Sequence, residues 1–127
     1  MPEYLTVEDL MVAARRYLGA EPEIRDAGLL DSAVARPLTT VFGQEAYPDL
    51  DSKGAALLHS IVGNHALVDG NKRLGWTATQ LFYGLNGYEL VADEDAEYEC
   101  VIGVAAGRID DVTEIASRLA GWRRPWR

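Results

Sequence analysis

The segment His65-Ala66-Leu67-Val68-Asp69-Gly70-Asn71-Lys72-Arg73 lies between two apolar segments, each with the periodicity of a helix. The pair Gly70-Asn71 is typical of a turn, because both residue types tolerate positive φ. The pattern therefore predicts a helix that ends near His65, a tight turn, and a second helix that begins with Asn71, Lys72 and Arg73.

The start of this second helix is a candidate anion site. A helix start leaves about four backbone N–H groups unpaired and carries roughly half a positive charge. Lys72 and Arg73 add two cations there, and His65 supplies a possible base from the preceding helix. Taken singly, the two cations would be solvated surface residues and the histidine a helix cap. Their ordered combination favours a phosphate ester held beside a general base.

Asp69 is the carboxylate of the segment. Its spacing of four from His65 would suit two metal ligands on one helix, but structural zinc needs more nitrogen or sulfur ligands than the nearby sequence offers. Magnesium bound together with a nucleotide fits better. His59 lies on a different helical face from His65, so we assign it a structural role.

Composition narrows the class of protein. The chain has 127 residues, of which 48% are hydrophobic, and this suits one compact domain with its own core. No apolar run approaches the roughly 20 residues of a membrane span, and no signal-peptide pattern follows Met1. The single cysteine, Cys100, favours the cytoplasm. A net charge of -8 argues against direct nucleic-acid binding, although a local cationic pocket remains compatible with it.

The chain before the motif predicts two helices and a loop. The first helix is expected to be capped by Thr6 and to stop at Gly19, and the second covers residues 29–36 before Pro37. The segment 38–50 loses helical periodicity and contains strand-forming and turn residues, which predicts a loop with a hairpin. Such loops often cover a binding site, and an unconstrained surface loop is the alternative.

Four more helices are expected, which gives an all-α fold of about six helices with little sheet. One opens with Asn71, Lys72 and Arg73, and the other three are expected to be capped by Ser52, Asp93 and Asp110. We divide the chain into a domain at residues 1–121 and a basic, tryptophan-containing tail at 122–127, which is either a docking segment or frayed. The acidic series of the fifth helix is expected to be a solvated face. The expected inward residues of the last four helices are Ala55, Leu58, Ile61, Val62, Leu74, Thr77, Ala78, Leu81, Phe82, Leu85, Tyr98, Val101, Ile102, Ala105, Val112, Ile115, Ala116 and Leu119.

The pattern H-x-x-x-D-G-N-K-R, from His65 to Arg73, resembles the signature of the Doc toxins within the Fic superfamily. The resemblance implies a compact all-α Fic/Doc-type bundle, with a loop or short hairpin flap near the active site. It also implies a toxin of a toxin–antitoxin pair, an ATP-dependent kinase that phosphorylates a threonine of elongation factor Tu. A Phd-like antitoxin is the implied partner, with its C-terminal helix in a groove of the toxin.

The resemblance also implies residue roles. His65 would take the proton of the acceptor hydroxyl, Asp69 would hold Mg²⁺, and Asn71, Lys72 and Arg73 would bind the phosphates of ATP within a loop that includes Gly70. Lysine at position 72, where most of the superfamily has glycine, implies transfer of the γ-phosphate by a reversed ATP.

The sequence departs from the family pattern at several positions. Leu67 replaces the usual aromatic residue, Ala66 a frequent proline, and Gly63 a frequent basic residue, so turnover is expected to be slower than is typical. Trp76 stands where adenylyl-transferring relatives often carry arginine, which favours phosphorylation. Two alternatives stay open: adenylyl transfer to a protein hydroxyl, and a catalytically weak co-repressor that binds the antitoxin.

Overall fold

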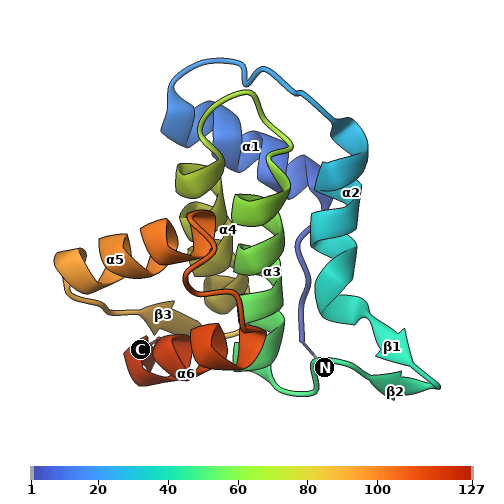
Figure 1. Cartoon of the computed structure of the whole chain (residues 1–127), viewed down its shortest axis with the longest axis vertical. Coiled ribbons are helices and arrows are strands. Elements are labelled where there is room, and N and C mark those ends of the chain that lie inside the picture. Colours follow the sequence, from blue (N-terminus) through green and yellow to red (C-terminus); the bar gives the residue numbers. More distant parts are fainter. Residues whose placement is uncertain (1, 127) are drawn as a thin grey trace.

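The computed structural model describes residues 2–126, and across this range six α-helices confirm the all-α fold (Figure 1). They are α1 (Val7–Leu18), α2 (Ala27–Ala35), α3 (Leu50–Asn64), α4 (Asn71–Leu85), α5 (Glu94–Ala105) and α6 (Val112–Trp122). A 3₁₀ turn, η1 (Arg36–Leu38), follows α2. Within the described residues, no helix is long and apolar enough to cross a bilayer.

Helices α3 and α4 form the centre of the bundle, and the motif loop joins them at one end (Figure 1). Their inward residues are almost fully buried, including Leu58, Val62 and Ala78. The helices approach closely at Gly75, where an added Cβ would lie 2.5 Å from Cγ2 of Val62. A larger residue at position 75 would therefore force α3 and α4 apart.

The helix starts are partly as expected. Thr6 caps α1 in a capping box with Asp9, and Gly19 ends that helix with φ 75°, so both expectations are confirmed. The expected cap of α3 is wrong, because Asp49 caps it and Ser52 is the third helical residue, which bonds back to the Asp49 backbone. The expected cap of α6 is also wrong by one position, since Asp111 accepts from Thr113 N–H.

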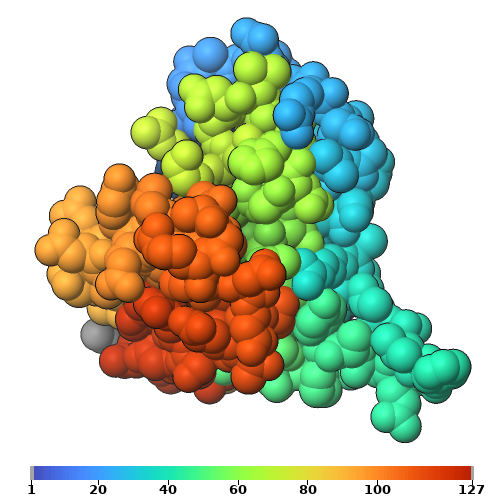
Figure 2. Space-filling model, in the orientation of Figure 1, coloured from blue at the N-terminus to red at the C-terminus, as the bar shows by residue number. Residues whose placement is uncertain are grey.

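A hairpin does form in the segment before α3, from β1 (Thr40–Val41) and β2 (Gln44–Glu45). Its tip, Phe42 and Gly43, has positive φ at both residues. The expected place of this hairpin beside the motif is wrong, because it lies at the N-terminal end of α3 and projects from the body of the protein (Figures 1 and 2). The 15 residues of α3 separate the hairpin from the motif by about 22 Å.

The C-terminal segment also forms a strand. Strand β4 (Arg123–Pro125) pairs antiparallel with β3 (Tyr88–Leu90), and Trp126 N–H donates to the carbonyl of Gly87 at 2.9 Å. The alternative of a frayed tail is therefore wrong for the residues up to Trp126. Helix α6 itself continues to Trp122, one residue into the expected tail. Arg127 lies outside the described residues.

Most of the expected inward residues are buried or partly buried, with three clear exceptions. Leu81 is 39% exposed, Leu85 50% and Tyr98 68%. Each lies on a helix whose expected apolar stripe is wider than the face that its neighbours cover. All three line one of two surface depressions along α4.

The structural role of His59 is confirmed. Its Nδ1 lies 2.6 Å from a guanidinium nitrogen of Arg36, and its Nε2 lies 2.8 Å from Oδ1 of Asp110. The imidazole thus joins η1, α3 and the loop before α6. Arg36 continues the network, because it donates to Tyr47 and Ser60.

Candidate functional site

The motif loop is positioned by backbone pairing with a segment far away in sequence. Val68 N–H donates to the carbonyl of Glu23 at 2.9 Å, and the carbonyl of Ala66 accepts from the N–H groups of Arg25 and Asp26 at 2.8 and 3.0 Å. Leu67 is 1% exposed and fixes the loop to the core, as its apolar character suggests. The segment that borders the motif is thus 23–26, and not the hairpin.

Asn71 closes this loop from within. Its Oδ1 accepts from Leu67 N–H at 3.0 Å, and its Nδ2 donates to the carbonyl of Leu67 at 2.9 Å. The side chain is almost fully buried, so its amide is occupied by the backbone of the loop. The contribution that Asn71 can still make to an anion is its backbone N–H, in the first turn of α4.

The start of α4 has free hydrogen-bond donors. Gly70 occupies the N-cap position with φ 90°, and no side chain of residues 2–126 caps the helix there. A Cβ added at position 70 would lie 2.8 Å from Cδ2 of Leu18, so the leucine side chain would have to move, and the φ would strain any side chain there. The glycine therefore leaves the first N–H groups of α4 open to an anion.

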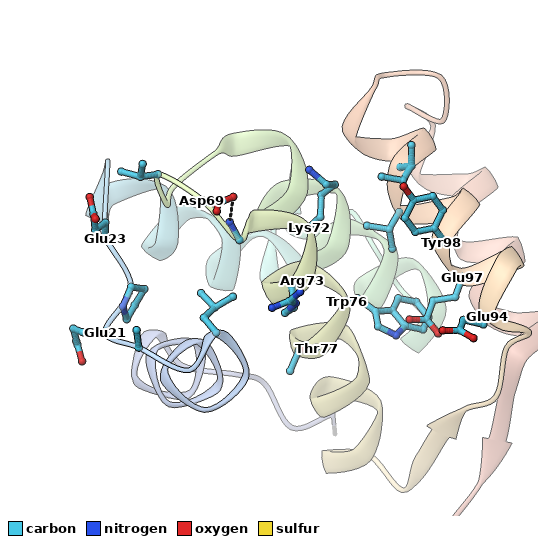
Figure 3. Close-up of a pocket in the computed structure, with 17 residues that line it drawn as sticks. Glu21, Glu23, Asp69, Lys72, Arg73, Trp76, Thr77, Glu94, Glu97 and Tyr98 are labelled. Atoms are coloured by element: carbon cyan, nitrogen blue, oxygen red, sulfur yellow. Dashed lines mark hydrogen bonds between the residues drawn. The ribbon is translucent and has the colours of Figure 1, made fainter.

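A cleft of about 690 Å³ opens beside this helix start, between residues 18–23 and α5 (Figure 3). Asp69, Gly70, Lys72 and Arg73 line it, so the structure brings four of the six expected site residues together. Within the described chain, neither cation pairs with a carboxylate. Two positive charges beside open N–H groups are a setting for phosphates.

His65 lies at the other end of the loop. It is the C-cap of α3 with φ 54°, its side chain is exposed, and it is absent from the lining of the cleft. Within residues 2–126, no side chain or backbone group is hydrogen-bonded to its ring. The exposed imidazole is accessible from solvent at the end of α3.

Asp69 is the motif residue suited to a metal ion. Its Oδ1 accepts from Gly70 N–H at 2.9 Å, which orients the carboxylate and leaves Oδ2 free. Within residues 2–126, no group of three His, Cys, Asp or Glu side chains gathers to hold a metal by itself. One carboxylate beside a phosphate site fits Mg²⁺, which proteins commonly bind through one or two carboxylates together with substrate phosphates.

The wall formed by α5 was missed by sequence reasoning. Trp76 of α4 and Tyr98, Glu94 and Glu97 of α5 all line the cleft (Figure 3). Burial, and then the neighbouring Glu94 charge, raise the pKa of Glu97 above its ordinary value. One residue could have indicated this wall from the sequence. Tyr98 is a large aromatic residue among carboxylates, on a helix whose inward face already had Val101 and Ile102.

Comparison with known proteins identifies the family, and the match includes the motif residues. The sequence model of the Fic/DOC family matches residues 4–83, which include the whole motif. The chain therefore belongs to the Fic/DOC family. It is 50% identical over 123 residues to Toxin Doc of Mycolicibacterium smegmatis, an alignment that covers 96% of this chain and 95% of that protein. This similarity confirms the Doc group as the relevant branch of the family.

Proposed function

We propose that this chain is the toxin of a toxin–antitoxin pair and a protein kinase that transfers the γ-phosphate of ATP to a threonine of elongation factor Tu. The similarity to Toxin Doc supports the role as a toxin, and membership of the Fic/DOC family supports an enzyme that transfers a group from a nucleotide. One observation supports the kinase activity most directly. Lys72 and Arg73 lie together at the start of α4, which no side chain of the described residues caps, and both line the cleft. Phosphorylated elongation factor Tu would no longer support translation, and we place the protein in the cytoplasm with its substrate.

The motif residues have distinct tasks in this proposal. The acceptor hydroxyl gives its proton to His65, its oxygen bonds to the γ-phosphorus, and the bond from that phosphorus to the β,γ-bridging oxygen breaks, so ADP leaves. Lys72, Arg73 and the N–H groups of α4 hold the phosphates and stabilise their charge. Asp69 would hold Mg²⁺, which neutralises phosphate charge when it is bound. Asn71 keeps the loop in the shape that presents these groups.

A Phd-like antitoxin is the proposed partner, and an exposed apolar groove supports it. The groove, of about 390 Å³, runs between α1 and α4 and is lined by Tyr17, Leu81, Leu85 and Trp126, which are 39% to 58% exposed. Thr77 lines both this groove and the cleft, so the two depressions are neighbours along α4. An amphipathic helix is a suitable occupant of an apolar groove of this kind.

Intact-mass analysis of elongation factor Tu tests the chemistry. The factor is incubated with this protein, ATP and magnesium, in parallel with the His65→Ala and His59→Ala variants. A gain of one phosphoryl group with the unmodified protein and with His59→Ala, but not with His65→Ala, is expected. His59→Ala is the matched control, because the same side chain is removed from the same helix, away from the motif.

Other outcomes would redirect the proposal. A gain of one adenylyl group would assign the alternative transfer, for which the same base would serve. No gain at all, with antitoxin binding retained in His65→Ala, would favour the co-repressor.

A further inference from the structure

The C-terminal strand β4 is bonded to the neighbouring chain at both of its ends. Trp126 N–H donates to the carbonyl of Gly87 at 2.9 Å, and Val91 N–H donates to the carbonyl of Trp122 at 2.8 Å. These two bonds flank the three residue pairs of the β3–β4 ladder. The strand therefore has a defined register, which brings Trp126 next to the end of α4.

Arg123 attaches the same strand to two helices. One of its guanidinium nitrogens lies 3.6 Å from Oδ2 of Asp51 in α3, and its Cζ lies 5.0 Å from the centroid of the Tyr88 ring. The other oxygen of Asp51 accepts from the hydroxyl of Tyr83, a fully buried residue of α4, at 2.6 Å. A single carboxylate thus joins β4 to α3 and α4.

Trp126 forms a wall of the apolar groove between α1 and α4. A Cβ added at Gly84 would lie 3.7 Å from Nε1 of Trp126, so the indole rests against α4 at this glycine. The side chain is 58% exposed and lines the groove together with Tyr17 of α1. This wall lies beyond the part of the chain that matches the Fic/DOC family, which ends within α4.

The charge around the groove differs from that of the whole chain. The net charge is -8, yet no carboxylate of the described residues lines the groove. Arg16 lies beside it, with Cζ 6.0 Å from the centroid of the Tyr17 ring, and pairs with no carboxylate of residues 2–126. A partner with carboxylates beside an apolar face is therefore complementary, whereas a second copy of this acidic chain would be repelled.

We infer that the C-terminal strand is part of the partner-binding surface, where Trp126 anchors the apolar face of an acidic amphipathic helix and the Arg123–Asp51 pair holds the strand in place. Aromatic side chains in apolar grooves commonly contribute most of the binding energy of an interface. Because one strand makes both sets of contacts, partner binding and strand docking should strengthen each other. The inference rests on the proposed function for the identity of the partner, the antitoxin.

Binding calorimetry tests the anchor with the full chain and the C-terminal peptide of a Phd-like antitoxin. Trp126→Ala should weaken binding at least about ten-fold, and Trp126→Phe should recover most of the loss. Phe42→Ala is the matched control, because it removes an exposed aromatic side chain that does not line the groove. This control should bind like the unmodified protein.

Asp51→Asn tests the ion pair at a site outside the groove. The amide keeps an acceptor for the hydroxyl of Tyr83 but removes the charge that holds Arg123, so binding should weaken about three-fold. Hydrogen exchange, measured by NMR, should be faster in this variant at the amides of Trp126 and Val91. Peptide binding to the unmodified protein should slow exchange at the same amides. Unchanged exchange in both experiments would overturn the coupling of strand and groove.

Arg16→Gln tests the charge of the partner. It should weaken peptide binding about three-fold at low salt, and the difference should disappear at high salt. Equal affinity at low salt would overturn the acidic character of the helix.

The outcomes distinguish this inference from the proposed function. Peptide affinity that is unchanged in Trp126→Ala would overturn the role of the C-terminal strand and leave the toxin proposal in place. Failure of the unmodified protein to bind the peptide would overturn the proposed partner and this inference together. The kinase proposal would still be decided by the mass of elongation factor Tu.

Discussion

The two ends of α3 carry two connections that are held in opposite ways. At its start, the β1–β2 hairpin pairs with itself and is attached to the helix by Lys53, whose Nζ lies 2.8 Å from Oε1 of Glu45. At its end, the motif loop pairs with residues 23–26 and is closed by Asn71. The hairpin therefore depends on local turn chemistry, whereas the motif loop depends on the folded domain around it. A change that loosens the motif loop should affect both stability and function, but one that loosens the hairpin should affect stability alone.

Removal of the base should give the largest effect at the motif end. His65→Ala is expected to lower the rate of transfer by about 10²- to 10⁴-fold, the usual contribution of a positioned base. The side chain of His65 is exposed, but alanine is strained at its φ of 54°, so a small fall in melting temperature is expected. Initial rates and differential scanning calorimetry check the two parts. A variant that melts much lower would mean that the lost rate reflects damaged structure.

Asn71→Ala should lower both the stability of the protein and its rate of transfer. It leaves the buried N–H and carbonyl of Leu67 without partners, so the free energy of unfolding should fall by about 2 kcal/mol. Transfer should fall as well, because the loop is no longer held. Asn86→Ala is a matched control, since Asn86 makes the same pair of bonds to the backbone of Glu3 at an exposed site. Urea denaturation should show less than half the loss for this control. Equal losses would contradict the special role of the motif loop.

These two ends also differ in how well the sequence predicted them. The helices on both sides of the motif followed from apolar periodicity and the turn at Gly70, because these signals are local. The place of the hairpin was wrong for another reason: it rested on the general tendency of long loops to cover sites, although the length of the helix between residues 52 and 65 already separates residues 38–50 from the motif. The wall of the cleft at Tyr98 was missed because α5 reaches the motif only through tertiary packing. Strand β4 has three residues, too few for a local signal, and its partner lies more than 30 residues earlier.

Lys53→Met should have a smaller effect, limited to the hairpin end. Burial is the largest influence on Lys53 and opposes its charge, but the hydrogen bond to Glu45 and the further interactions with Tyr4 and Glu45 together outweigh it and raise the pKa of the lysine. Its replacement leaves the carbonyl of Tyr47 without this donor and should lower the free energy of unfolding by about 1 kcal/mol. The rate of transfer should stay at the level of the unmodified protein. A clear loss of rate would show that the hairpin and the motif are coupled through α3.

The smallest effect is expected on the α5 wall, and it depends on pH. The raised pKa of Glu97 means that folding favours its protonated form, a contribution present below its ordinary pKa and lost as the pH rises through the folded value. Glu97→Gln should therefore raise the melting temperature slightly at pH 7, and the gain should vanish near pH 4. Glu99→Gln, which removes an exposed carboxylate, is the control and should show no such gain. A gain independent of pH would contradict the ionisation argument.

The contact between Gly70 and Leu18 has a consequence for the evolution of the family. A side chain at position 70 meets both an unfavourable φ and the methyl groups of Leu18. A smaller residue at position 18 would open the space but would leave the φ of 90° strained for any side chain, so we expect glycine at position 70 among relatives whatever residue stands at 18. An alignment in which bulky residues occur freely at position 70 would show that the loop tolerates another path into α4.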